Sequence, residues 1–287
     1  MNGRILVTGA TGTVGREVVT RLAGAGASVR AAARNPGMLA LPEDSVEILS
    51  MDLRDPADLD RAMEDAEKIF LLTPLDQAMA EVTALVVDRA RAHGVEHIVR
   101  LSALGVGYPR RITLGTVHGE AERMIRASGI DWTFLRPNAF MQNFISYWGE
   151  SIRTRKTFCV PQGQGRVSLI DVRDIAEVAV ETLVGAGHRG KAYALTGPAA
   201  LSNYEVAEIF SNNLGREISY QDISKQEARD ALSAQGMSEW MVNVITELFE
   251  MSAADEAADV TDAVERLTGK TPIDFDAFVR DFRHAFA

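Results

Sequence analysis

The chain has 287 residues, 46% of them hydrophobic, and a formal charge of −10, which fits one domain with a smaller lobe and argues against nonspecific nucleic-acid binding. No apolar run approaches the ~20 residues that span a bilayer, and no leader precedes the first strand-like segment, so we expect a cytoplasmic protein without a membrane partner. Cys159 is the only cysteine, and the five histidines lack ligand spacing. Neither a disulfide nor a metal site is therefore expected.

A glycine-rich turn lies near the start of the chain. Residues 5–7 form a short apolar run typical of a buried parallel strand, and apolar residues recur at helical spacing over 14–22. Glycines between a strand and a helix let a ligand approach the backbone, and the helix N–H groups suit a pyrophosphate. A tight turn without a ligand is the simpler alternative. The sequence predicts dinucleotide contacts at Gly9, Thr11, Gly12, Thr13, Val14 and Gly15.

Strand and helix patterns then alternate along the chain. We expect further strands at 28–33, 46–50, 68–72, 97–102, 132–136 and 191–195, and helices at 79–93, 116–128 and 171–184. This order predicts an α/β fold with a doubly wound parallel sheet and helices on both faces. The rhythm breaks after Pro137. The predicted dinucleotide-binding domain is therefore 1–138 with 169–196 returning to it, and 139–168 and 197–287 form a smaller, helix-rich, substrate-binding lobe.

The end of the second predicted strand indicates which nucleotide binds. NAD-binding folds place an acidic residue there to hold the ribose 2′-hydroxyl. Here three alanines are followed by Arg34, whose guanidinium can bind a 2′-phosphate through forked hydrogen bonds. NADP(H) is therefore the expected cofactor, and an exposed loop arginine is the alternative.

Two later turns are expected beside the same nucleotide. Asp52 and Leu53 follow the third strand and are predicted beside the adenine, although Asp52 could instead cap a helix starting near Pro56. Thr73 and Pro74 follow the fourth strand and are predicted near the pyrophosphate and ribose. A purely structural turn explains the Thr-Pro pair nearly as well.

From Arg4 to about Tyr220 the chain resembles the NmrA-like branch of the atypical short-chain dehydrogenase/reductases. The motifs that carry this resemblance, in chain order, are GATGTVG, ARNP, MDLRD, LLTP, LSALG, LRPNAFMQNF, DVRDIAEVA, YALTGP and LSNYEVAEIF. The resemblance implies a Rossmann fold, a dinucleotide and an active-site cleft. The branch looks close to bacterial NAD(P)H-dependent quinone and triphenylmethane reductases, and it also contains regulators that bind dinucleotide without turnover.

The catalytic Tyr-x-x-x-Lys pair of the wider family is missing. No tyrosine of this chain has a lysine four positions later, and the family's two positions fall on His118 and Glu122. His118 could donate a proton or a hydrogen bond to the substrate, or be only a polar residue of a helix. Ser102 stands where the family serine would and is expected to touch the ligand; otherwise it only ends a strand.

Two segments are candidates for contact with the substrate. The loop 105–116 contains three glycines and could close over a ligand, and its Arg110 and Arg111 could attract an anion. An aromatic-rich segment follows the sixth strand and could cover a cleft at the strand ends, or be a helix packed into the lobe. The predicted pocket residues are Asn138, Phe140, Met141, Phe144, Tyr147 and Trp148, with Asn138 as the main polar contact.

These observations predict an NADPH-dependent oxidoreductase that transfers a hydride to a small, planar, electron-poor acceptor, such as a quinone, an imine or a cationic dye. Such acceptors need little acid catalysis, which fits the missing tyrosine and lysine. A non-catalytic NADP(H) sensor that binds a protein partner is the alternative, and a sugar- or isoflavonoid-type reductase or isomerase is a third. A monomer or a homodimer is expected.

Overall fold

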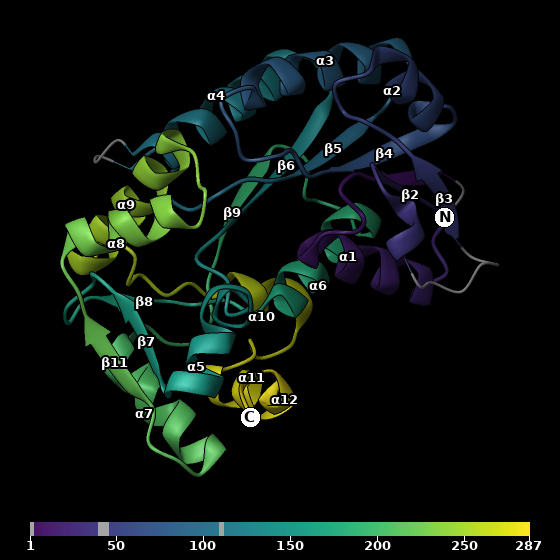
Figure 1. The fold of residues 1–287 in the computed structure, drawn as a ribbon. Coiled ribbons are helices and arrows are strands. Elements are labelled where there is room, and N and C mark those ends of the chain that lie inside the picture. The colour runs from purple at the N-terminus through teal and green to yellow at the C-terminus, as the bar shows by residue number, and fades with distance from the viewer. Residues whose placement is uncertain (1–2, 40–45, 109–111) are drawn as a thin grey trace. The chain divides into compact units, whose positions relative to one another are not determined.

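The structure, a computed structural model, describes residues 3–39, 46–108 and 112–287. The chain forms two compact units (Figure 1). The first unit holds residues 1–109, 114–136 and 175–194, and the second holds 110–113, 137–174 and 195–287. Each unit is described by itself below.

A seven-stranded sheet of order β3-β2-β1-β4-β5-β6-β9 is the centre of the first unit. Its strands are β1 (Arg4–Val7), β2 (Val29–Ala33), β3 (Val46–Ser50), β4 (Ala66–Leu71), β5 (His97–Leu101), β6 (Asp131–Pro137) and β9 (Lys191–Leu195). Neighbouring strands from β3 to β6 pair in parallel. β9 joins β6 in the same sense, because Gly190 N–H bonds Trp132 O at 2.7 Å and Asn138 N–H bonds Leu195 O at 2.9 Å.

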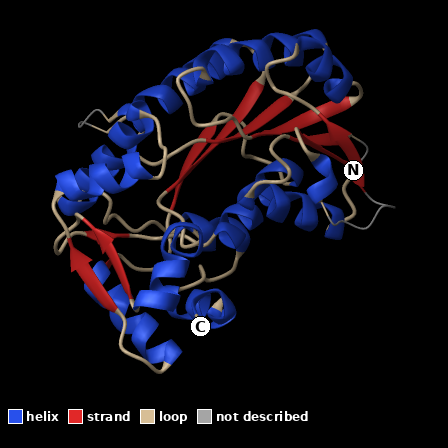
Figure 2. Ribbon diagram, in the orientation of Figure 1, coloured by secondary structure: helices blue, strands red, loops and turns tan. Residues whose placement is uncertain are grey.

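Helices cover both faces of this sheet (Figures 1 and 2). One face carries α1 (Thr13–Gly24) and α6 (Val172–Val184), and the other carries α2 (Pro56–Met63), α3 (Met79–Ala92) and α4 (Thr113–Ala127). A 3₁₀ turn, η1 (Pro36–Met38), follows β2. Between the sheet and α2–α4 lies a buried apolar cluster that includes Leu6, Met63, Ile98 and Phe134. Strand order reverses between β1 and β4, which is where open α/β sheets bind ligands at the carboxyl ends of the strands.

The second unit is mainly helical and has an aromatic core. Its short strands are β7 (Thr157–Val160), β8 (Arg166–Val167), β10 (Leu201–Ser202) and β11 (Ser219–Asp222). Its helices are η2 (Phe144–Trp148), α5 (Gly149–Arg155), α7 (Asn203–Leu214), α8 (Lys225–Ala234), α9 (Glu239–Ala253), α10 (Ala263–Thr268), α11 (Phe275–Asp281) and α12 (Arg283–Phe286). β7 pairs with β11 in parallel, and β8 with β10 antiparallel. The core contains the aromatic rings of Phe144, Phe158, Phe210 and Phe275, which contact one another edge-on or tilted.

The predicted fold class is confirmed: the sheet is parallel, doubly wound and covered by helices, and the later part of the chain is helix-rich. The predicted strand bounds differ from the observed ones by at most two residues. α4 starts at Thr113 and not at 116. The assignment of one domain to the dinucleotide and the other to the substrate stays a prediction.

Candidate functional site

The glycine turn has a separate structural reason for each glycine. Gly9 has φ +59°, and a Cβ there would lie 3.2 Å from Leu72 Cβ. A Cβ on Gly15 would lie 2.3 Å from the Gly9 carbonyl oxygen, so Gly15 lets α1 pack closely on the turn. Gly12 is exposed and begins α1 without any side-chain cap on the helix. The first N–H groups of α1 therefore remain available to an anion.

The side chains of the turn differ in how they could contact a ligand. Thr13 is exposed and Thr11 is half-buried. The side chain of Val14 is buried in the core, so only the Val14 backbone could contact a nucleotide. The predicted contacts at this turn are thus mainly backbone contacts, as the glycines suggest.

Thr8 is a residue that the sequence reasoning missed. It is fully buried where β1 ends, and its hydroxyl donates to Leu72 O at 2.9 Å and accepts from Leu72 N–H at 2.8 Å. These bonds fix the glycine turn to the chain that leaves β4, on both sides of the point where the strand order reverses. A hydroxyl between a buried strand and the first glycine was the signal in the sequence.

Arg34 follows β2 and is exposed. Within the described ranges 3–39, 46–108 and 112–287, no acidic side chain forms an ion pair with its guanidinium, and its carbonyl accepts from Ser50 Oγ at 3.3 Å. β2 itself ends in buried alanines, so it offers no carboxylate to a ribose hydroxyl. This end of β2 fits a nucleotide that carries a 2′-phosphate.

The alternative role of Asp52 as a helix cap is wrong. Asp55 caps α2, because its carboxylate accepts from Ala57 N–H at 2.8 Å and Pro56 occupies the first helical position. Asp52 instead accepts from Arg54 N–H at 2.9 Å. Leu53 belongs to the apolar cluster under α2–α4, which limits any contact with an adenine to its exposed edge.

A buried polar chain connects the ends of β4 and β5. Arg100, in β5, is fully buried and donates to His118 Nδ1 at 2.9 Å and to Thr73 Oγ1 at 3.2 Å. Burial, and then the charge of Arg100, lowers the pKa of His118 from 6.5 to about 3. His118 is therefore a neutral imidazole at pH 7. Pro74, beside Thr73, is exposed.

Glu122 lies one helical turn beyond His118 and belongs to a different cluster. It is fully buried and accepts from Ser102 Oγ at 2.7 Å, from Arg126 at 2.9 Å, and from Arg136 at 2.8 and 2.6 Å. Burial alone would raise its pKa, but the hydrogen bonds from Arg136 and Ser102 and the charges of Arg136 and Arg126 outweigh this, so the pKa is lowered.

The two positions of the family's Tyr and Lys thus have unlike surroundings. His118 joins Arg100, and Glu122 is an anion held among arginines. The one proton of the Ser102 hydroxyl is donated to Glu122, so only its oxygen lone pair is left for a ligand. The ligand contact expected of Ser102 stays a prediction.

Asn138, expected as the main polar contact of the substrate, has structural partners. Its amide nitrogen donates to Ser168 Oγ at 2.8 Å and to Ala257 O at 2.9 Å, and its Oδ1 accepts from Ala139 N–H at 2.8 Å. Both hydrogen atoms of the side-chain amide are thus donated to residues of the second unit. The side chain is better explained as a brace between two loops than as a binding group.

The other predicted pocket residues divide between core and surface. Phe144 is buried in the aromatic core, which favours the alternative that the segment packs into the lobe. Tyr147 is 58% exposed, and Phe140 and Trp148 are half-buried. Met141 is buried and, with Leu169, Ile209 and Phe275, lines an apolar cavity of about 110 Å³. Tyr147, Phe140 and Trp148 remain the candidates for substrate contact.

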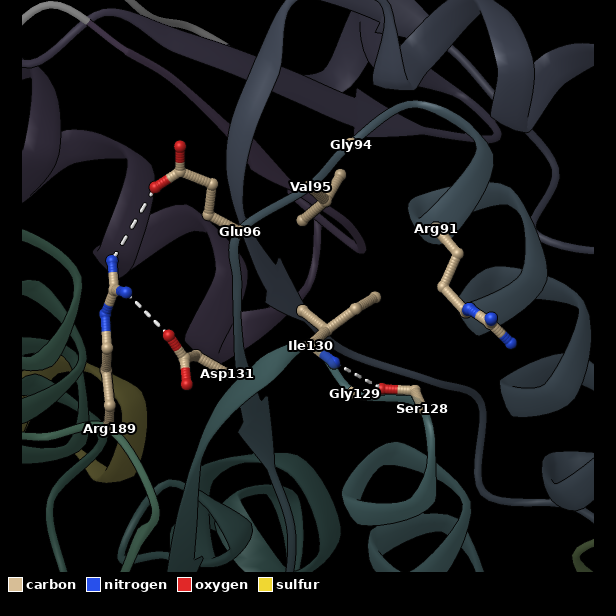
Figure 3. A pocket seen from close by; sticks show the side chains of 9 residues that line it. All are labelled: Arg91, Gly94, Val95, Glu96, Ser128, Gly129, Ile130, Asp131 and Arg189. Carbon is tan, nitrogen blue, oxygen red and sulfur yellow. Dashed lines mark hydrogen bonds and ion pairs between the residues drawn. The ribbon is translucent and has the colours of Figure 1, made fainter.

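In the first unit, a cavity of about 460 Å³ lies at the amino ends of the sheet's strands (Figure 3). It is lined by residues that precede β5, β6 and β9 and by the first residue of β6: Arg91, Gly94, Val95, Glu96, Ser128, Gly129, Ile130, Asp131 and Arg189. Arg189 is paired with Asp131 at 2.5 Å and with Glu96 at 3.7 Å (Figure 3). This cavity is at the amino ends of the strands, so it is not the expected place for a nucleotide.

In the loop 105–116, Gly105 and Gly107 have positive φ, while Arg110 and Arg111 lie outside the described residues.

In the described part of the chain, no group of three or more His, Cys, Asp or Glu side chains could hold a metal ion. None of the helices described is both long and apolar enough to cross a membrane.

Known proteins resemble this chain over nearly its whole length. An NAD(P)H azoreductase of Xenophilus azovorans is 36% identical over 283 residues, 98% of this chain and 99% of the relative. The (4-alkanoyl-5-oxo-2,5-dihydrofuran-3-yl)methyl phosphate reductase of Streptomyces griseus is 38% identical over 293 residues, 99% of each chain. The crystal structure of an NADPH-dependent quinone oxidoreductase from Escherichia coli, complexed with NADPH, is 25% identical, with a TM-score of 0.87 and coverage of 97% and 99%.

The family model with the description NmrA-like family matches residues 1–278. Its match spans both units and includes the glycine turn, Arg34, His118 and the aromatic segment. The resemblance noted from the motifs is thereby confirmed, and this chain belongs to the NmrA-like family.

Proposed function

We propose that this protein is an NADPH-dependent reductase that transfers a hydride to a small, planar, electron-poor acceptor. The observation that carries the proposal is the exposed glycine turn, where α1 begins at Gly12 without a side-chain cap and Arg34 stands in place of the acid of NAD-binding folds. Two relatives that match 98% and 97% of this chain are named as an NAD(P)H azoreductase and an NADPH-dependent quinone oxidoreductase, whose acceptors are electron-poor π systems. We further propose a cytoplasmic monomer or homodimer, in keeping with the free Cys159.

In this proposal, different residues of the first unit bind the cofactor, fix the turns around it and contact the acceptor. The N–H groups of α1 bind the pyrophosphate, and Arg34 binds the 2′-phosphate. When bound, NADPH supplies the hydride, which is the difficult part of the chemistry. Thr8 and Thr73 hold the turns at the ends of β1 and β4 in place. His118 offers a hydrogen bond and no acidic proton, since it is neutral at pH 7.

A panel of acceptors tests the proposal directly. Oxidation of NADPH is followed by its absorbance with quinones, azo dyes, cationic dyes, imines and enones. We expect turnover with at least one quinone or dye. Tight NADPH binding without turnover across the whole panel would refute the enzyme and favour a cofactor sensor.

The preference for NADPH over NADH should depend on Arg34. We expect NADPH to bind at least tenfold more tightly than NADH, because a charge-assisted hydrogen bond to phosphate contributes about 1.5–3 kcal/mol. Arg34→Ala should remove this difference and leave NADH affinity unchanged. Calorimetric titration of both cofactors measures it, with Arg91→Ala as a control for the loss of an exposed arginine. Equal affinities in the wild type would contradict the assignment.

His118 should be an auxiliary group. A positioned general acid contributes about 10²–10⁴-fold, whereas one hydrogen bond of roughly 0.5–1.5 kcal/mol corresponds to about two- to tenfold. We expect His118→Ala and His118→Gln to keep at least a tenth of wild-type kcat with a quinone, and glutamine to retain more because it keeps an N–H donor. A thousandfold loss in both variants with unchanged NADPH affinity would make His118 an acid.

A further inference from the structure

Arg100 is a buried cation that forms no ion pair with a described residue, although the charge of the buried Glu122 acts on it. Among the residues that the structure describes, no carboxylate lies within ion-pair distance of its guanidinium, and its Nε has no hydrogen-bond partner. Its other nitrogens donate to Leu101 O, Thr73 Oγ1, Met79 Sδ and His118 Nδ1, at 2.9–3.2 Å. Burying a cation among such weak partners costs free energy. A hydrophobic residue would fill the same space at lower cost, so the guanidinium calls for a functional explanation.

The bond from Arg100 to His118 can have only one direction. A guanidinium has no acceptor atom, so His118 Nδ1 must accept, and the proton of the neutral ring is then on Nε2. Arg100 also opposes protonation of the ring by its charge. The other charged group close to this pair is Glu122, one turn further along α4, and its carboxylate is already bound by Ser102, Arg126 and Arg136. No bond from Nε2 to a described residue is present, so this N–H is available to a ligand.

We propose that Arg100 is a positioning residue that holds His118 as the neutral Nε2–H tautomer, so that His118 donates a hydrogen bond to an oxygen or nitrogen of the acceptor on which negative charge develops. This inference rests on the proposed function and names the class of acceptor that benefits. A quinone that accepts the hydride supplied by NADPH gains one bond to hydrogen and loses one π bond, whose electron pair moves onto oxygen, while NADPH is oxidised to NADP⁺. The Nε2–H stabilises that oxygen, which then takes its proton from water, and His118 keeps its own.

The Nε2–H donor of His118 should not stabilise the reduction of a cationic acceptor. A hydride that adds to a cationic dye or an iminium ion neutralises a positive charge, and no anion forms. His118 and Arg100 should therefore matter for quinones and azo compounds and not for cationic dyes. This selectivity separates a hydrogen-bond donor from a residue that only keeps the site folded, since misfolding would lower turnover of both classes.

The tautomer is measured without any cofactor or substrate. Long-range ¹H–¹⁵N spectra of the ¹⁵N-labelled protein, with the His118 signals assigned by the His118→Gln variant, report which ring nitrogen carries the proton. In the wild type at pH 7 we expect a protonated Nε2 and a bare Nδ1, with a titration midpoint below pH 5. In Arg100→Met the midpoint should rise by at least one pH unit and the two tautomers should mix. Arg91→Met, an exposed arginine of α3, should leave both unchanged.

Turnover supplies the second readout. Arg100→Met should lower kcat two- to tenfold with a quinone and less than twofold with a cationic dye, Arg100→Lys should restore part of the loss, and Arg100→Met in the His118→Ala background should cost nothing more. An Nδ1–H tautomer, an imidazolium at pH 7, or an unchanged titration in folded Arg100→Met would overturn the role of Arg100. If the wild-type protein oxidised NADPH with no acceptor of the panel, the proposed function would be overturned instead. The spectra would still decide the tautomer of His118.

Discussion

Gly12→Val is expected to abolish NADPH binding and to leave the fold intact. The backbone at Gly12 has φ −74° and ψ 169°, an extended conformation that valine adopts readily. A Cβ there would meet only the Gly9 carbonyl oxygen, at 3.2 Å, and the branched side chain would then occupy the space through which a pyrophosphate reaches the N–H groups of α1. Calorimetry should show an affinity loss on the order of 100-fold or more, about 2.7 kcal/mol, with an unchanged circular dichroism spectrum.

Two other glycines of α1 serve as controls for this variant. Gly24, at the end of the helix, has no atom within 4 Å of an added Cβ, so Gly24→Val should bind NADPH normally. Gly15→Val should instead destabilise the protein, because its Cβ would lie 2.3 Å from the Gly9 carbonyl oxygen. Normal NADPH binding by a folded Gly12→Val protein would reduce the glycine turn to a structural feature.

Glu122→Ala is expected to lower the free energy of unfolding by about 1.5–3 kcal/mol, because it removes the charged acceptor shared by Arg136, Arg126 and Ser102 while both arginines keep some contact with solvent. Glu122→Gln should have a smaller effect in the same direction, since it keeps the volume and one acceptor oxygen. Urea denaturation followed by circular dichroism measures both. Glu120→Ala, on the same helix and without an ion pair in the described structure, should change stability by less than about 0.5 kcal/mol.

The pH dependence of the Glu122 effect has a definite sign. Its pKa is lowered in the folded protein, so its stabilising contribution is complete above the unfolded value of about 4.5 and is lost as the pH falls through the folded pKa. The stability difference between wild type and Glu122→Gln should therefore be constant from pH 5 to 8 and shrink in more acidic solution. A difference that grows on acidification would mean that Glu122 is not an anion in the folded state.

Local patterns in the sequence determined the secondary structure and the glycine turn. A buried parallel strand is a short continuous apolar run, and a helix with one buried face repeats its apolar residues at helical spacing, so 5–7 and 14–22 could be recognised without knowledge of their neighbours. The glycine spacing and the absence of an acid before Arg34 are likewise local features. The cap of α2 was also a local signal, Asp55 before Pro56, but the alternative considered for this role was Asp52.

The partners of the buried polar side chains were decided only by the tertiary structure. Arg100 looked like an ordinary residue of a strand, yet the packing of β5 against α3 and α4 places its guanidinium on Thr73, Met79 and His118. Asn138 looked like a binding group, yet its amide reaches Ala257, 119 residues away. Local periodicity reports whether a residue is buried, but a hydrogen bond depends on which distant segment is packed opposite. The sequence by itself therefore specified the sheet, the turn and the expected cofactor, and the fold alone specified that His118 accepts a hydrogen bond from the buried Arg100.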